Sequence, residues 1–104
     1  MPLLDEIVAL RADAAELAAA VQDGGPVTRL GGLAELKAAQ ARLDELVTQV
    51  QQSGAELKGL APLLLDFPAE LSGETVLLCW LEGDHELAWY HRPDLGFAGR
   101  RPLP

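Results

Sequence analysis

The side chains that can do chemistry in this 104-residue chain lie toward its C-terminal end. Cys79 is the one cysteine, and His85 and His91 are the two histidines. If Cys79 and His91 lie on neighbouring strands, they provide a thiol and a base, the pair that a cysteine nucleophile requires. The residues beside Cys79 are Leu78 and Trp80, however, and a buried free cysteine usually behaves as a small hydrophobic side chain. We therefore expect no catalytic residue and no cofactor.

A second group of side chains offers oxygen and nitrogen ligands for a divalent metal. Its members are Asp66, Glu82, Asp84, His85, Glu86 and His91. A turn at Gly83 would interrupt the alternation that places three of these carboxylates on one side of a strand. The spacings of the HExxH zinc motif and of the EF-hand are both missing from the sequence. We therefore assign no metal ligands, and divalent-metal binding is kept as an alternative.

Asp66 needs a partner, because a carboxylate near a core must be paired. In one interpretation it faces a ligand near His91. In the other it accepts hydrogen bonds from backbone N–H groups, or pairs with Arg100 or Arg101, and so holds the C-terminal tail in place. We favour the second interpretation.

The tail segment Gly96-Phe97-Ala98-Gly99-Arg100-Arg101 has the composition of an anion site. Its glycines allow a sharp turn, Phe97 offers a stacking face, and two guanidinium groups fit a phosphate or carboxylate. The spacing differs from the known phosphate-binding fingerprints. We favour the other interpretation, in which Phe97 lies in the core and the arginines pair with the acidic section at residues 61–91. The candidate ligand-binding residues are Asp66, His91, Phe97, Arg100 and Arg101.

The first sixty residues predict two helices, since apolar residues recur there at alternating spacings of three and four. The first helix should end at Gly24-Gly25-Pro26. We expect the second to continue through Gly54, because the same spacing reaches Leu57 and Leu60; a stop at Ser53-Gly54 is the alternative. A short connection makes the two helices an antiparallel hairpin over about residues 2–60.

The following residues predict strands at 63–67, 75–81 and 86–91, rich in β-branched and aromatic side chains. Pro68 should end the first strand, and Glu82 to His85 should form a turn. The expected fold class is α+β, with the antiparallel helical hairpin packed on a small three-stranded antiparallel β-meander and followed by an irregular C-terminal tail. We expect a single domain over residues 1–104, with a β unit at about 63–92 and a tail at 93–104.

The central strand is apolar on both faces, because Val76, Leu78 and Trp80 alternate with Leu77 and Cys79. The helices can cover one face, so the tail or a second copy of the chain must cover the other. We expect a homodimer, and the favoured function is a non-enzymatic interaction or scaffold module. The alternative is a small-molecule (anion) or divalent-metal-binding protein, and possibly an enzyme.

The formal net charge of −8 argues against nucleic acid as a partner, since nucleic-acid binding relies on basic patches. The apolar run at residues 76–81 is far shorter than the about 20 residues that a membrane span needs. The first residues lack the basic start of a secretory signal, and one cysteine excludes an intramolecular disulfide. We therefore expect a cytoplasmic protein that binds neither nucleic acid nor membranes.

An ordered set of short motifs resembles the bacterial domain-of-unknown-function family 2203. The motifs are Leu65-Asp66-Phe67-Pro68-Ala69, Val76-Leu77-Leu78-Cys79-Trp80, Gly83, His91 and Gly96-Phe97-Ala98-Gly99-Arg100-Arg101-Pro102-Leu103. The resemblance implies a small cytoplasmic bacterial protein in which helices precede a compact β unit. It implies no activity.

Overall fold

The protein divides into two compact units in a computed structural model that describes residues 2–22, 24 and 30–104. The first unit comprises residues 1–49 and the second comprises residues 50–104. Each unit is described by itself below.

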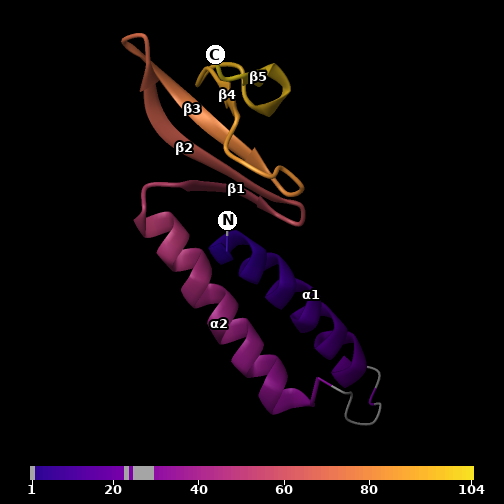
Figure 1. Ribbon diagram of the computed structural model, residues 1–104. Helices are drawn as coiled ribbons and strands as arrows, with labels where there is room; N and C mark the ends of the chain where they lie inside the picture. Colours follow the sequence, from indigo (N-terminus) through magenta and orange to yellow (C-terminus); the bar gives the residue numbers. More distant parts are fainter. Residues whose placement is uncertain (1, 23, 25–29) are drawn as a thin grey trace. The chain divides into compact units, whose positions relative to one another are not determined.

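The first unit is a pair of antiparallel helices, α1 (Pro2–Gln22) and α2 (Leu33–Gln52) (Figure 1). Ala14 and Leu17 in the second half of α1 pack against Leu36 at the start of α2. Glu6 near the start of α1 lies 3.3 Å from the guanidinium of Arg42 further along α2. The predicted helical pair is therefore confirmed. Within the described residues, neither helix is long and apolar enough to cross a membrane.

The boundaries of the first helix agree with its sequence signals where the structure describes them. α1 ends at Gln22, and Gly24 follows with φ of 65°, a left-handed conformation that glycine adopts without steric cost. The two other residues of the predicted stop, Gly25 and Pro26, lie outside the described residues.

The second helix is shorter than predicted. It ends at Gln52, and Gly54 has φ of 99°, a conformation that continues no helix. The predicted extension through residues 55–60 is wrong, because Glu56–Leu60 form the strand β1 instead.

A bulge in β1 explains why the sequence pattern there resembles a helix. Leu57 pairs with Leu65 and Leu60 pairs with Leu63, while the register shifts between Leu57 and Gly59. The extra residue of a β-bulge puts two side chains that are three apart on the same face of the sheet. The spacing of three was therefore compatible with a strand as well as with a helix.

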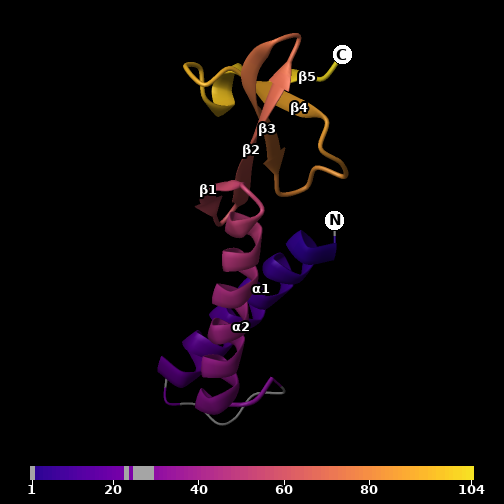
Figure 2. The same cartoon turned by 90° about the vertical axis from the view of Figure 1, so that its left-hand side faces the viewer.

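The second unit is an antiparallel sheet of five strands in the order β1-β2-β3-β4-β5, not of the three predicted (Figures 1 and 2). The other strands are β2 (Leu63–Leu71), β3 (Glu74–Leu81), β4 (Trp89–His91) and β5 (Arg101–Pro102). The α+β class is thus confirmed. The two additional strands are β1, from the segment predicted as helix, and β5, from the segment predicted as irregular tail.

Pro68 does not end its strand, in contrast to the prediction. β2 continues to Leu71, and Pro68 pairs with Leu77 of β3. β1 pairs with β2 no further than Asp66, so the other side of β2 is an edge beyond that point. Proline is tolerated at a sheet edge, because its missing N–H is not needed there.

The C-terminal tail returns to the sheet and reaches the face that carries Cys79. A single turn of 3₁₀-helix, η1 (Phe97–Gly99), lies to one side of the sheet (Figure 2), and β5 then pairs with β4. Cys79 is completely buried, and Arg100 of the tail lies next to it, because Arg100 stacks on Trp89, the strand partner of Cys79. The tail, one of the two covers predicted for one face of the central strand, therefore lies on the face that carries Cys79.

The end of α2 determines whether Gly54→Ala should raise or lower the free energy of unfolding. In the interior of a continuous helix, Gly54→Ala would stabilise the protein by about 1 kcal/mol. At φ of 99° it should instead lower the free energy of unfolding by about 1–2 kcal/mol, although a Cβ there meets no neighbouring atom. Urea unfolding measures the change. Gln52→Ala, at an exposed site in the last turn of α2, is the control, and stabilisation by Gly54→Ala would contradict the helix boundary.

Candidate site: a buried Asp66–Cys79–His91 cluster

Three adjacent strands bring Asp66, Cys79 and His91 to the same face of the sheet. Asp66 of β2 pairs directly with Cys79 of β3. His91 of β4 pairs with Leu77, which lies two residues before Cys79 on β3. Because side chains alternate between faces along a strand, Leu77 and Cys79 share a face, and so do their partners.

The three side chains are close together and almost inaccessible to solvent. Their exposed fractions are 4% for Asp66, 0% for Cys79 and 3% for His91. Nε2 of His91 lies 3.1 Å from Oδ1 of Asp66. One ligand atom from each residue lies within 4.8 Å of the other two. A carboxylate oxygen, a thiol sulfur and an imidazole nitrogen thus converge in one buried place.

The hydrogen bonds of His91 fix its tautomer. Its Nδ1 lies 2.9 Å from the backbone carbonyl oxygen of Arg92, which can only accept, so Nδ1 must carry a hydrogen and donate it. The other nitrogen, Nε2, therefore has either a lone pair or a second hydrogen directed at Asp66. Its hydrogen bond with the carboxyl group requires one proton between them. The pair is thus neutral overall, as an acid with an imidazole or as a carboxylate with an imidazolium.

Burial raises the pKa of the Cys79 thiol, and the nearby carboxyl group of Asp66 raises it further. The hydrogen bond from the Arg100 guanidinium acts in the opposite direction but does not outweigh them. Both nitrogens of His91 are already engaged, with Arg92 and with Asp66. The geometry is therefore not that of a cysteine nucleophile whose proton is taken by a histidine.

Arg100 adjoins the cluster and is held on several sides. Its Nη1 lies 3.0 Å from Oδ2 of Asp84, and its guanidinium carbon lies 4.5 Å from the ring centre of Trp89 and 4.9 Å from that of Phe97. Trp89 pairs with Cys79 across the strands, which places this contact next to the thiol. We call Asp84, Trp89, Phe97 and Arg100 the arginine clamp.

Asp84 connects the arginine clamp to the turn between β3 and β4. Its Oδ2 accepts hydrogen bonds from the backbone N–H of Leu81 at 2.9 Å and from Arg100. Burial by itself would raise the pKa of the Asp84 carboxyl, but these two donors outweigh it and lower the pKa. Asp84 is therefore ionised under ordinary conditions and matches the positive charge of Arg100.

The structure brings together most of the predicted site residues, but in other pairings. Asp66 contacts His91 rather than Arg100 or Arg101, so the favoured interpretation of Asp66 as an anchor for the tail is wrong in its partner. Arg100 pairs with Asp84 instead. Phe97 is partly exposed and stacks on Arg100 rather than filling the core.

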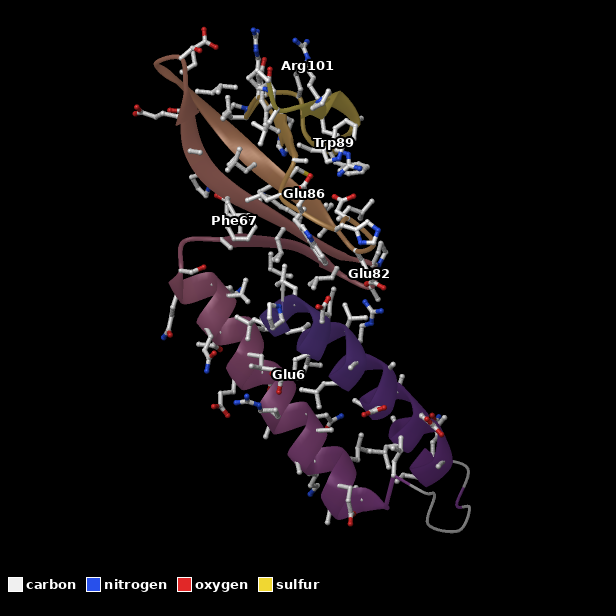
Figure 3. All side chains as sticks on the ribbon, viewed as in Figure 1. Glu6, Phe67, Glu82, Glu86, Trp89 and Arg101 are labelled. Carbon is white, nitrogen blue, oxygen red and sulfur yellow. The ribbon has the colours of Figure 1, made fainter. Side chains whose placement is uncertain are left out.

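Arg101 is separated from this group. It pairs with Tyr90 across β4 and β5, whereas Arg100 contacts Trp89. Trp89 and Tyr90 are consecutive strand residues and point to opposite faces. The side chains of Trp89 and Arg101 lie at the β4–β5 end of the sheet (Figure 3).

The ion pair of Arg100 with Asp84 agrees with the interpretation that the arginines pair with the acidic section at residues 61–91. The stacking of Arg100 on Trp89 was not predicted, and Cys79 was not selected because its sequence neighbours are apolar. The alternation of side chains along β3 and the expected pairing of β3 with the next strand could have indicated that Cys79 and His91 lie close together. The pairing of β2 with β3, which adds Asp66, depends on a register that spacing alone does not fix.

The described residues therefore define an α+β protein with a buried polar cluster in its sheet. A family model described as "Uncharacterized conserved protein (DUF2203)" matches residues 1–103. The chain belongs to this family, which confirms the resemblance noted from its motifs. Comparison with curated proteins found no significant match. Comparison with solved structures found none either.

The charge on Asp84 should make the stability of the second unit depend on pH. Asp84→Asn keeps an acceptor for Leu81 but removes the charge opposite Arg100, so it should lower the free energy of unfolding by about 1–3 kcal/mol near neutral pH. Because the pKa of Asp84 is lowered by folding, its contribution is complete above its ordinary pKa of about 3.9 and is lost as the pH falls through the folded value.

The difference between wild type and Asp84→Asn should therefore narrow as the pH falls below about 4. Chemical unfolding at a series of pH values measures it. Asp94→Asn, at an exposed position of the tail, should change stability by no more than about 0.5 kcal/mol. A gap that stays constant down to low pH would contradict the assigned role of Asp84.

Proposed function

We propose that the second unit binds a divalent transition-metal ion through Asp66, Cys79 and His91. The observation that supports this is the convergence of three different donor atoms from three strands within 4.8 Å, in a buried place. Sulfur, imidazole nitrogen and carboxylate oxygen are the ligands that zinc uses in proteins.

The donor set favours a particular class of metal. Mg²⁺ and Ca²⁺ prefer sites made of oxygen ligands, whereas a thiolate and an imidazole suit Zn²⁺ and its neighbours in the transition series. Three protein ligands leave one position of a tetrahedral ion for water or another small donor. We therefore expect Zn²⁺ as the ion, with Co²⁺ as a spectroscopic substitute.

The orientation of His91 suits this role. A metal-binding histidine usually donates its second ring N–H to a carbonyl or carboxylate, which fixes the direction of the coordinating nitrogen. Here the Arg92 carbonyl accepts from Nδ1, so Nε2 is directed at Asp66. A metal would take the place of the proton that these two groups share.

The charge balance supports a divalent ion. Without metal, the Asp66–His91 pair with its proton and the protonated Cys79 thiol have no net charge. With a divalent ion, a carboxylate, a thiolate and a neutral imidazole again sum to zero. A net charge in a buried place is costly, and a monovalent ion would leave one.

Titration with Co²⁺ tests the proposal. Wild type should develop the near-ultraviolet absorption of a cobalt–thiolate bond, and Zn²⁺ should remove it by competition. Cys79→Ser should abolish this band, and Asp66→Asn and His91→Gln should each weaken binding by at least about 10–100-fold, the loss typical of residues that only support metal ligands. His85→Gln, at the exposed second histidine, is the control and should bind as wild type does.

Two outcomes would overturn the proposal. One is a wild type that develops no thiolate band and gains no thermal stability with Zn²⁺, since an ion that binds only the folded state must raise the unfolding temperature. The other is binding that Cys79→Ser and His91→Gln leave unchanged while His85→Gln weakens it.

Metal binding should also become stronger as the pH rises. Because burial raises the pKa of Cys79, the thiol is protonated near neutral pH and must release its proton to bind metal. The apparent association constant should thus increase by up to about tenfold per pH unit for this one proton.

Calorimetry in buffers of different ionisation enthalpy counts the released protons. Wild type should release about one proton more than Cys79→Ser, if that variant retains weak binding. Release that is independent of Cys79 would show that the thiol is not a ligand.

A homodimeric interaction module, the function favoured from the sequence, stays a prediction. Its basis was an apolar face that needs a cover, and the tail contacts that face at Cys79. This contact reduces the need for a second copy of the chain there. The bacterial source and the cytoplasmic location also stay predictions.

A further inference from the structure

The arginine clamp connects the C-terminal tail to the buried cluster. Phe97 and Arg100 belong to the tail, whereas Asp84 and Trp89 come from the turn after β3 and from β4. Arg100 is held by an ion pair with Asp84 and by two aromatic rings. One of these rings, Trp89, pairs with Cys79 across the strands, so the guanidinium lies next to the thiol.

We propose that Arg100 is a positioning residue of the metal site, which supports Cys79 as a thiolate ligand and holds the tail closed over it. This inference rests on the proposed metal function. Arg100 would contact the metal only through Cys79, and it would therefore act on the strength of the metal–sulfur bond and on access to the ion.

The position of the guanidinium next to the Cys79 sulfur carries the first part of the proposal. An N–H group that donates to a thiolate draws electron density from the sulfur and fixes its direction. A donor that is itself charged makes a stronger hydrogen bond than a neutral one. Arg100 does not disturb the charge balance of the site, because Asp84 lies 3.0 Å from it and neutralises it.

The planar shape of the guanidinium carries the second part. It lies against both Trp89 and Phe97, at 4.5 Å and 4.9 Å from the ring centres. A planar cation can stack on rings and still direct N–H groups at a carboxylate and a sulfur, whereas the compact ammonium of lysine does not reproduce both. Phe97 is the more exposed of the two rings and belongs to the tail, so its stacking on Arg100 attaches the tail at this place.

Two substitutions separate the two parts. Arg100→Gln removes the charged donor, and it should shift the energy of the cobalt–thiolate band and weaken metal binding by about 10–100-fold. Phe97→Ala removes one ring but leaves Arg100 and the ligands in place. It should leave the band energy unchanged and accelerate the release of metal to an excess of chelator by about two- to fivefold, the effect of losing one cation–π contact at an exposed ring.

Two further variants serve as controls. Arg101→Gln removes the charge of the next residue, which lies opposite Tyr90 in the register of β4 and β5. It should change neither the energy of the cobalt–thiolate band nor the rate of metal release. Arg100→Lys keeps the charge and should restore the band energy only in part. Circular dichroism establishes that each variant is folded, and if Arg100→Gln is not, Arg100→Lys and Phe97→Ala carry the test.

The outcomes distinguish this inference from the function on which it rests. A wild type without a cobalt–thiolate band overturns both. A wild type with that band, together with Arg100 and Phe97 variants whose band energy, affinity and release rate equal those of wild type, overturns only the role of Arg100. Equal effects of Arg100→Gln and Arg101→Gln would also overturn it, because they would indicate a general effect of charge.

Discussion

The hydrogen bond between His91 and Asp66 is the interaction on which the second unit depends. Both side chains are buried, and removing either would leave the other without its partner in a place that water does not reach. The bond exists only when β2, β3 and β4 keep their register, because a slip of one residue would move Asp66 to the opposite face. The Nδ1 hydrogen bond to Arg92 sets the direction in which Nε2 faces. Strand register, histidine tautomer and the donor set of the site are therefore consequences of a single arrangement.

The tail covers part of the sheet face that carries the buried polar side chains. Gly96, with φ of 66°, lets the chain turn into η1, and the chain then returns to add β5 beside β4. Between η1 and β5, the guanidinium of Arg100 stacks on the rings of Trp89 and Phe97 and forms an ion pair with Asp84. The tail thus supplies both a cover for the thiol and the positive charge that an inward-facing carboxylate requires.

The sequence allowed the two helices and the strands β2 and β3 to be predicted, because their apolar spacing is a local signal. β1 was missed because its bulge gives Leu57 and Leu60 a helical spacing. β5 was missed because a strand of two residues is too short to show an alternating pattern, and its pairing depends on residues distant in the sequence.

The same limit applies to the site. Asp66 and His91 are 25 residues apart and were both selected by their chemistry, but their contact follows from pairing across three strands. Arg100 and Arg101 differ in role because Arg100 precedes β5 and stacks on Trp89, whereas Arg101 begins β5 and pairs with Tyr90, whose side chain is on the opposite face from that of Trp89.

The distribution of charge now has a structural explanation. Residues 61–91 contain six acidic side chains and no basic one. Three of the six, Glu70, Glu74 and Glu86, are exposed. The other three each have a defined partner: Asp66 has His91, Glu82 accepts from the backbone N–H of Leu63, and Asp84 has Arg100. Half of the acidic side chains of this section are therefore exposed, whereas each of the less exposed ones has a hydrogen-bond partner. A metal ion bound as proposed would replace the thiol proton of Cys79 rather than join a cluster of unpaired carboxylates. Selectivity among metals would then depend on the sulfur and nitrogen donors rather than on the net charge of the chain.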